Sequence, residues 1–293
     1  MAKNAQTSVQ PRTGRKRLAI SPVPRKMLAK FSKPTQSKSE VDVVALLEDL
    51  SFTYTGSPSQ VLALSWDKVA VKRILREKGV STPRGEVLSV AEAARWDCFP
   101  AIVKPSREHG STGVTADAVV TDTRELQARI AYVEKNYRQP ALVEDFIEGR
   151  EIHATIWGNG RLEMLPPAEM GFSAFIETRR HLCTYDSKFK PGTEDFEKID
   201  VIVPAPLDDR QIRQLEKLSV GVYRAIGCRD YARIDLRLRG DTFYVLDINP
   251  NADLSPDTST VFAAAAKGRS YGQFISGLVG LAAHRHPVFS TAS

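Results

Sequence analysis

Residues 231–249 read YARIDLRLRGDTFYVLDIN. Apolar residues alternate there with polar and charged ones, which is typical of strands that bury one face. We predict strands over 231–238 and 242–248, joined by the tight turn Arg239-Gly240-Asp241. With short strands and helices elsewhere in the chain, this hairpin predicts an α+β fold in which antiparallel sheets are flanked by helices.

The hairpin also carries the residues most suited to a metal site. Arg233 and Asp235 share one face of the first strand, and Asp247 and Asn249 share one face of the second. If the two faces coincide, two carboxylates, an amide oxygen and a guanidinium converge. Two acids that close favour a cation between them, and Mg²⁺ prefers hard oxygen ligands. A solvated hairpin with alternating polar residues is the alternative.

The remaining elements are read from periodicity, caps and turn residues. Ser65 is predicted to cap a helix that ends at Gly79, and a second helix, Asp209–Ile226, is closed by Gly227. A polar loop is expected through Phe196. Further strands are predicted over 99–104, 115–120, 141–147 and 152–157, with helices from about residue 258.

Composition places few limits on function. The chain has 293 residues, 42% hydrophobic and 26% charged, which is ordinary for a soluble α/β protein. No apolar run approaches the roughly 20 residues of a membrane helix, so no membrane association is expected. Cys98, Cys183 and Cys228 are far apart and form no metal-binding pattern, which predicts reduced thiols and a cytoplasmic location.

The net charge of +6 comes from one end of the chain. Residues 1–39 contain ten Lys or Arg and no acid, so the rest holds 31 basic against 35 acidic residues. We predict a basic, disordered tail, because its composition offers little apolar surface to bury. A nucleic-acid or anionic-surface arm around Gly14–Arg17, an organelle transit peptide and an incorrectly assigned start stay open.

Two further stretches are candidates for nucleotide contacts. Lys104 ends an apolar strand, where a buried ammonium needs an anion, and the segment 110–113 (Gly-Ser-Thr-Gly) can offer backbone N–H groups to phosphates. The segment 141–151 passes from apolar to acidic residues and could face an adenine and a ribose. Ordinary strand and turn sequences explain each stretch equally well when it is taken alone.

The order of the motifs is more specific than any one of them. It resembles the ATP-grasp superfamily, and within it the D-alanine–D-alanine ligase group, over roughly residues 44–283. The matching motifs are Tyr54–Ser57, Asp67-Lys68, Val103-Lys104-Pro105, Gly110–Val114, Val143–Glu151, Tyr185–Lys188, Ala232–Asp235 and Asp247–Asn249. The resemblance implies two α/β subdomains whose antiparallel sheets clasp ATP.

The resemblance also implies the nucleotide contacts, which are Lys68, Lys104, Gly110, Ser111, Thr112, Gly113, Glu144, Asp145, Phe146, Ile147 and Glu151. Lys68 and Lys104 would contact phosphates, and the glycine segment would close over them as a flexible loop. Glu144 would accept a hydrogen bond from the adenine amino group. The backbone of the next three residues would meet the ring edge, and Glu151 would hold the ribose hydroxyls.

The chemical roles follow from the same resemblance. Lys188 would reach the transferred phosphate, and Arg233 would stabilise the charge that develops during acyl transfer. Asp235, Asp247 and Asn249 would bind one or two Mg²⁺, with Mn²⁺ as a possible substitute. The implied domains are a tail (1–39), a remnant of a preceding domain (40–66) and an ATP-grasp domain (67–285) with subdomains 67–148 and 149–285.

The implied function is an ATP-dependent, ADP-forming carboxylate–amine ligase that acts through an acylphosphate on small amino acids or peptides. A homodimer is possible, and nucleic acid is expected to bind at most weakly to the tail. Three positions depart from the group: Asp247 replaces a usual Glu, the 249–256 segment lacks the usual Asn-Thr-x-Pro-Gly-Met run, and the glycine loop is one residue longer. The front domain is largely unmatched, so an ATP-binding module without ligase activity is the alternative.

Overall fold

The computed structural model describes residues 39–290. The described residues from Glu40 onward form one compact unit. The predictions for the basic tail fall outside the described residues, apart from Ser39 at the start of the first helix. Within the described range, no helix combines the length and apolar character needed to cross a membrane.

Three helices precede the sheets: α2 (Ser39–Asp49), α3 (Ser59–Trp66) and α4 (Lys68–Glu77). The sequence predicts a helix capped by Ser65, but Ser65 lies inside α3, and the chain breaks at Asp67 instead. The Asp67 carboxylate accepts a hydrogen bond from the backbone N–H of Ala70 at 2.9 Å and caps α4. The break places Lys68 at the first position of α4 and Lys72 one turn later on the same face.

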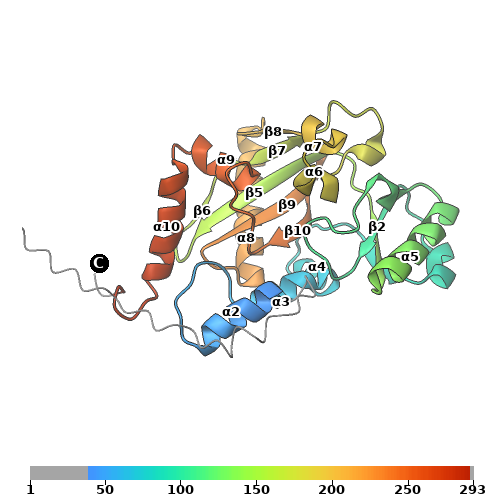
Figure 1. Cartoon of the computed structure of the whole chain (residues 1–293). Helices are drawn as coiled ribbons and strands as arrows, with labels where there is room; N and C mark the ends of the chain where they lie inside the picture. Colours follow the sequence, from blue (N-terminus) through green and yellow to red (C-terminus); the bar gives the residue numbers. More distant parts are fainter. Residues whose placement is uncertain (1–38, 291–293) are drawn as a thin grey trace, which may run out of the picture. The chain divides into compact units, whose positions relative to one another are not determined.

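The smaller sheet has four antiparallel strands in the order β1-β4-β2-β3. They are β1 (Gly85–Leu88), β2 (Ala101–Pro105), β3 (Val119–Val120) and β4 (Ala141–Asp145). The 3₁₀ helix η2 (Val90–Arg95) and α5 (Thr123–Tyr137) cover its apolar face (Figure 1). The strand predicted over 115–120 is shorter than expected, since Ala116–Ala118 forms the 3₁₀ turn η3.

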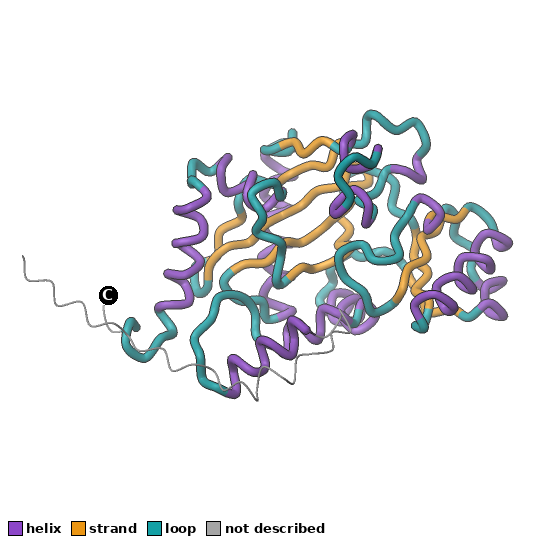
Figure 2. Tube along the Cα trace, in the orientation of Figure 1, coloured by secondary structure: helices purple, strands orange, loops and turns teal. Residues whose placement is uncertain are grey.

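The larger sheet is also antiparallel and runs β10-β9-β5-β7-β8, with β6 paired to β5. Figure 2 shows these strands side by side. Their bounds are β5 (Arg150–Gly158), β6 (Leu162–Met164), β7 (Ala168–Gly171), β8 (Asp200–Ile202), β9 (Tyr231–Arg239) and β10 (Thr242–Asn249). The antiparallel α+β prediction is confirmed.

Helices cover both faces of the larger sheet. One face packs on α8 (Asp209–Ile226) through a core that includes Leu215, Ile234 and Leu236. The α8 helix has the predicted bounds and ends at Gly227 in the left-handed region (φ 84°), and it begins with a capping box at Asp208. On the C-terminal side of the chain are α9 (Ser259–Ala266) and α10 (Tyr271–Ala283), and α9 packs against β5 and β7.

The predicted polar loop through Phe196 contains short helices. These are η4 (Thr178–Arg180), α6 (Tyr185–Phe189) and α7 (Glu194–Lys198), and the last two are capped by the side chains of Thr184 and Thr193. Because α6 contains Lys188, the capped turn gives that side chain a defined position beside the larger sheet.

Candidate active site

A cavity lies between the smaller sheet and the larger one. Its wall contains most of the predicted site residues: Lys68, Lys104, Gly110, Ser111, Thr112, Glu144, Asp145, Phe146, Ile147, Glu151, Lys188, Asp235, Asp247 and Asn249. Gly113 and Arg233 are predicted site residues that do not line it. The two sheets therefore bring together positions as far apart in sequence as Lys68 and Asn249.

The faces of the β9–β10 hairpin coincide. Asp247 lies directly opposite Asp235, and Asn249 lies opposite Arg233. A β-bulge between Val245 and Asp247 makes this possible, because it shifts the register by one residue. Val245 faces the α8 core, whereas Asp247 faces the cavity. Without the bulge, strict alternation would place Asp247 on the core side with Val245.

The acids of the hairpin are held by ion pairs and hydrogen bonds. Arg233 donates to both Asp235 oxygens at 2.7 and 3.0 Å, and the Asn249 amide nitrogen donates to Asp235 Oδ2 at 3.0 Å. Lys68 Nζ contacts Asp247 Oδ2 at 2.7 Å. Burial opposes ionisation of Asp247, but Lys68, together with His109 and Lys104, outweighs it and lowers the pKa of Asp247 to about 2.

Burial likewise opposes the charge on Asp235, and the Arg233 guanidinium, together with the nearby His153 and Lys188, outweighs it, so the pKa of Asp235 lies far below its usual range. Both carboxylates are thus ionised at neutral pH and face the same cavity. Two carboxylates and one amide side chain form a donor set that fits a hard divalent cation such as Mg²⁺ or Mn²⁺.

Opposite the hairpin, two lysines share one buried carboxylate. Lys104 Nζ lies 2.6 Å from Glu144 Oε2, and Lys72 Nζ lies 2.7 Å from Glu144 Oε1. Alternation along β2 explains the position of Lys104, since Ala101 and Val103 face the α5 core while Lys104 faces the cavity. The group of Lys72, Glu144 and Lys104 carries a net charge of +1 when all three are ionised.

The pKa values of this group reflect competition between burial and pairing. Burial lowers the pKa of Lys72 to about 8, and attraction to Glu144 only partly offsets it. Burial also opposes the charge on Lys104, but Glu144 and Asp247 outweigh it and raise its pKa. Lys72 is a site residue that the sequence analysis missed, although its spacing of four residues from Lys68 on a helix is a usable signal.

A second missed residue, Arg237, holds Glu151. The two lie opposite each other on β9 and β5, and Arg237 Nη2 contacts Glu151 Oε2 at 2.8 Å. Burial opposes the charge on Glu151, but Arg237, together with His153 and Cys183, outweighs it and lowers the pKa of Glu151 to about 2. The Arg237 guanidinium also lies 5.5 Å from the centre of the Phe146 ring. Arg237 shares the period-two face of Arg233 and Asp235, which is the signal that could have found it.

The segment after Glu144 has little backbone left for a ligand. The N–H of Asp145 donates to the carbonyl of Arg84 at 2.9 Å, and that of Phe146 donates to Pro100 at 3.0 Å. The N–H of Ile147 has no hydrogen-bond partner within the described residues. Ile147 is buried at the cavity wall. Ile147 is therefore the backbone donor available to a ring nitrogen.

The glycine segment turns through left-handed conformations, at two glycines and at one serine. Gly110, Ser111 and Gly113 have φ values of 63°, 61° and 75°. A Cβ at Gly113 would lie 2.9 Å from the ring of Pro105, so no larger side chain fits there. The Ser111 hydroxyl donates to the carbonyl of Cys183 at 2.8 Å, which holds the segment against the start of α6.

A second cavity adjoins the first, and the two share Gly110, Cys183, Lys188 and Asn249. Arg233 lines this second cavity, together with Trp66, Phe189 and the 250–253 segment. Glu40 closes one side, where its carboxylate accepts hydrogen bonds from Asn251 at 3.0 Å and from Trp66 at 3.3 Å. Residues from the predicted 40–66 segment therefore contribute to the site.

Comparison with known proteins gives a consistent result. The family model described as "D-ala D-ala ligase C-terminus" matches residues 70–280. A D-alanine–D-alanine ligase of Desulforudis audaxviator is 34% identical over 249 residues, which covers 83% of this chain and 77% of the relative. An uncharacterised protein of Sinorhizobium fredii is 35% identical and covers 83% of this chain and 70% of the relative.

Solved structures share the fold at lower identity. The D-alanine–D-alanine ligase of Bacillus anthracis complexed with ATP aligns with a TM-score of 0.65 at 22% identity, over 82% of this chain and 73% of that one. The VanG D-Ala:D-Ser ligase of Enterococcus faecalis aligns with a TM-score of 0.67 at 20% identity, over 82% and 68%. The chain therefore belongs to the D-alanine–D-alanine ligase family and has its ATP-grasp fold, as the order of motifs indicates.

Proposed function

We propose that this chain is an ATP-dependent, ADP-forming ligase that joins a carboxylate to an amine through an acylphosphate. One observation carries the proposal beyond family membership: the lysine- and acid-lined cavity adjoins a second cavity, and Lys188 and Asn249 line both. The first cavity suits a nucleotide and a cation, and the second suits the group that receives the phosphate.

The nucleotide's phosphates are assigned to Lys68 and Lys104. Each ammonium now lies against a carboxylate, Lys68 against Asp247 and Lys104 against Glu144. Charges in a buried site interact strongly with an incoming anion, because little water screens them. Glu144 is assigned to orient Lys104, and its acceptance of a hydrogen bond from the adenine amino group stays a prediction.

The divalent cation is assigned to Asp235, Asp247 and Asn249, with Mg²⁺ or Mn²⁺ as the ion. It would neutralise charge on the phosphate oxygens. Asp247 has one methylene less than Glu, so its reach is shorter by at most about 1.5 Å. We therefore expect Asp247 to depend on Lys68 for its position more than a longer side chain would.

Acyl transfer is assigned to the border of the two cavities. The substrate carboxylate oxygen attacks the γ-phosphorus and ADP leaves; the amine nitrogen then attacks the acyl carbon, loses a proton, and phosphate leaves. Both steps concentrate negative charge on oxygen atoms, and Lys188 and Arg233 lie where they can stabilise it. We assign small amino acids or peptides to the second cavity, because its wall includes the divergent 250–253 segment. The predicted homodimer and cytoplasmic location stay predictions.

Phosphate release from ATP in the presence of pooled amino acids tests the proposal. We expect release that depends on Mg²⁺ and on at least one pool, and its loss in Asp247→Ala. The matched control is Asp241→Ala, which removes an exposed acid from the turn of the same hairpin. Thermal stabilisation by Mg-ATP without turnover in any pool would instead favour the nucleotide-binding module without ligase activity.

A further inference from the structure

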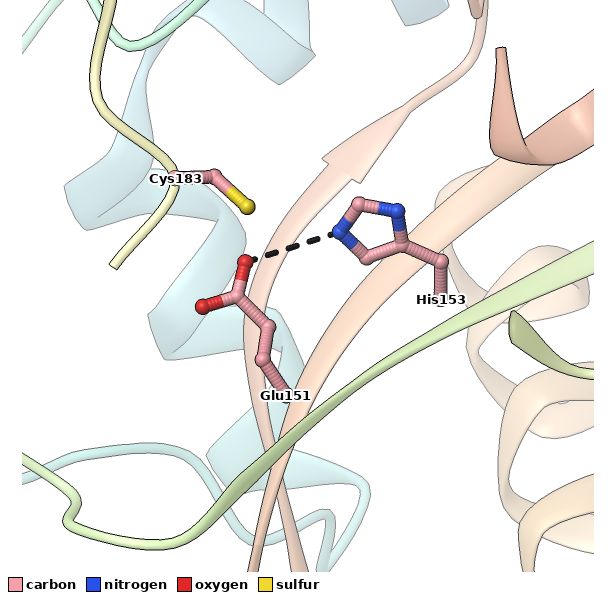
Figure 3. Close-up of side chains that lie close together, drawn as sticks. All are labelled: Glu151, His153 and Cys183. Atoms are coloured by element: carbon pink, nitrogen blue, oxygen red, sulfur yellow. Dashed lines mark ion pairs between the residues drawn. The ribbon is translucent and has the colours of Figure 1, made fainter. Parts of the chain in front are cut away.

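Glu151, His153 and Cys183 form a cluster whose chemistry differs from that of the hairpin acids. Glu151 and His153 project from the cavity face of β5, and Cys183 approaches from the segment that precedes α6, as Figure 3 shows. One ligand atom from each residue lies within 4.8 Å of the others. Glu151 Oε1 and His153 Nε2 are 3.5 Å apart.

The histidine is oriented as a metal-binding histidine would be. Its Nδ1 lies 3.0 Å from the hydroxyl of Ser259 at the start of α9, which fixes the ring. Its Nε2 is buried, has no partner of hydrogen-bond geometry among the described residues, and lies 3.5 Å from Glu151 Oε1 and 3.8 Å from Asp235 Oδ1. A buried polar atom without a partner is uncommon and calls for a missing ligand or water. Here that atom points at Glu151 and Cys183.

The other two residues differ in how their surroundings favour a cation. Arg237 Nη2 contacts Glu151 Oε2 at 2.8 Å, so Glu151 Oε1 is the oxygen that faces His153 and Cys183. Burial and the nearby Glu151 carboxylate raise the pKa of the Cys183 thiol well above its usual range. The thiol is therefore protonated when no cation is bound, and a bound divalent cation would displace that proton.

We propose that Glu151, His153 and Cys183 form a binding site for a zinc-class divalent cation. Nitrogen, sulfur and oxygen ligands together suit Zn²⁺, whereas Mg²⁺ prefers oxygen alone. In a tetrahedral site with bonds of about 2.0–2.3 Å, ligand atoms lie roughly 3.3–3.6 Å apart. The Glu151–His153 separation already matches this spacing, and Cys183 needs to approach by about 1 Å at most.

The fourth position of this site faces the nucleotide cavity, because Glu151 and Cys183 both line it. Glu151 is also the residue expected to hold the ribose hydroxyls. A cation on Glu151 therefore competes with ATP for the same carboxylate, and zinc inhibits nucleotide binding. This consequence rests on the proposed function, whereas cation binding itself does not.

The test is a Co²⁺ titration of the metal-free full chain with excess Mg²⁺ present to occupy the hairpin acids. Co²⁺ bound by a cysteine thiolate gives a near-ultraviolet charge-transfer band, which oxygen ligands do not give. We expect one equivalent to produce this band and one equivalent of Zn²⁺ to remove it. Cys183→Ser and His153→Gln should abolish the band, and Cys228→Ser, a cysteine outside the cluster, should retain it.

Ser259→Ala gives a graded control. It leaves all three ligands and removes only the group that orients His153, so the Co²⁺ affinity should fall by about 10- to 100-fold. Circular dichroism and a thermal melt verify that each variant is folded. Absence of a thiolate band in the folded wild-type protein, or a band that survives Cys183→Ser, overturns the proposal.

A second measurement separates the site from its consequence. We expect one equivalent of Zn²⁺ to weaken Mg-ATP binding in the wild type, a chelator to restore it, and Cys183→Ser to be insensitive. A thiolate band without any effect of Zn²⁺ on ATP binding would still support the cation site. It would contradict the placement of the ribose at Glu151.

Discussion

The buried pair of Glu151 and Arg237 should contribute more to stability than any exposed pair of this chain. A pKa lowered from 4.5 to about 2 corresponds to about 3 kcal/mol at neutral pH, since one pKa unit equals about 1.4 kcal/mol. Glu151→Gln leaves the buried Arg237 guanidinium without its counter-charge. We therefore expect Glu151→Gln to lower the free energy of unfolding by about 3–5 kcal/mol.

Urea denaturation of the metal-free protein measures this loss. Arg237→Met removes the other charge, and the double variant should lose less than the sum of the two single variants by about 1–3 kcal/mol. Glu194→Gln, which removes a carboxylate exposed beside Arg180, serves as the control and should change little. A Glu151→Gln loss below about 1 kcal/mol, or strict additivity in the double variant, would refute the reasoning.

The same pair predicts a pH dependence with a definite sign. The folded pKa of Glu151 is depressed, so its stabilisation is complete above about 4.5 and disappears as the pH falls towards about 2. The stability difference between the wild type and Glu151→Gln should therefore shrink over that range. A difference that grows as the pH falls would contradict the assignment.

Three further predictions follow from the site. Asp247→Asn should abolish metal-dependent phosphate release while the protein stays folded, and activity equal to wild type would remove Asp247 from the cation site. Gly113→Ala should lower the free energy of unfolding by about 1–3 kcal/mol more than Gly192→Ala does. Both glycines have positive φ, but only a Cβ at Gly113 would meet a neighbouring ring. Equal melting temperatures of the two variants would contradict this. Lys72→Met leaves Glu144 paired with Lys104 alone and should weaken ATP binding, which calorimetry measures. An unchanged dissociation constant for ATP would contradict this prediction.

Local sequence determined several elements because their physical causes are local. The Asp208 capping box and the left-handed Gly227 define α8, and both depend on residues within one turn of the helix ends. The break at Asp67 was missed because Ser65 and Asp67 are both good N-caps; in the structure the Ser65 hydroxyl donates to the carbonyl of Leu62 inside α3, and Asp67 caps α4. The short helices after Thr178 were missed because they are too brief to show a period.

Some of the site residues could likewise be predicted from the sequence, and others could not. The family resemblance carried by the order of motifs named fourteen residues that line one cavity, although the motifs lie on strands, on turns and on the helices α4 and α6. Lys72 and Arg237 were missed because a single basic residue on a helix or strand is ordinarily solvent-exposed. Only the approach of Glu144 and Glu151 from other strands gives them a role.

The sequence by itself determined the period-two pattern of residues 231–249, and with it the pairing of Arg233 with Asp235 and of Asp247 with Asn249. Only the tertiary structure decided that these pairs face each other, because the bulge after Val245 turns Asp247 away from the core. It also decided that Cys183 joins a cluster with two residues of β5. Contacts of this kind depend on the register within one sheet and on how the segment before α6 packs on β5, and no local pattern encodes either.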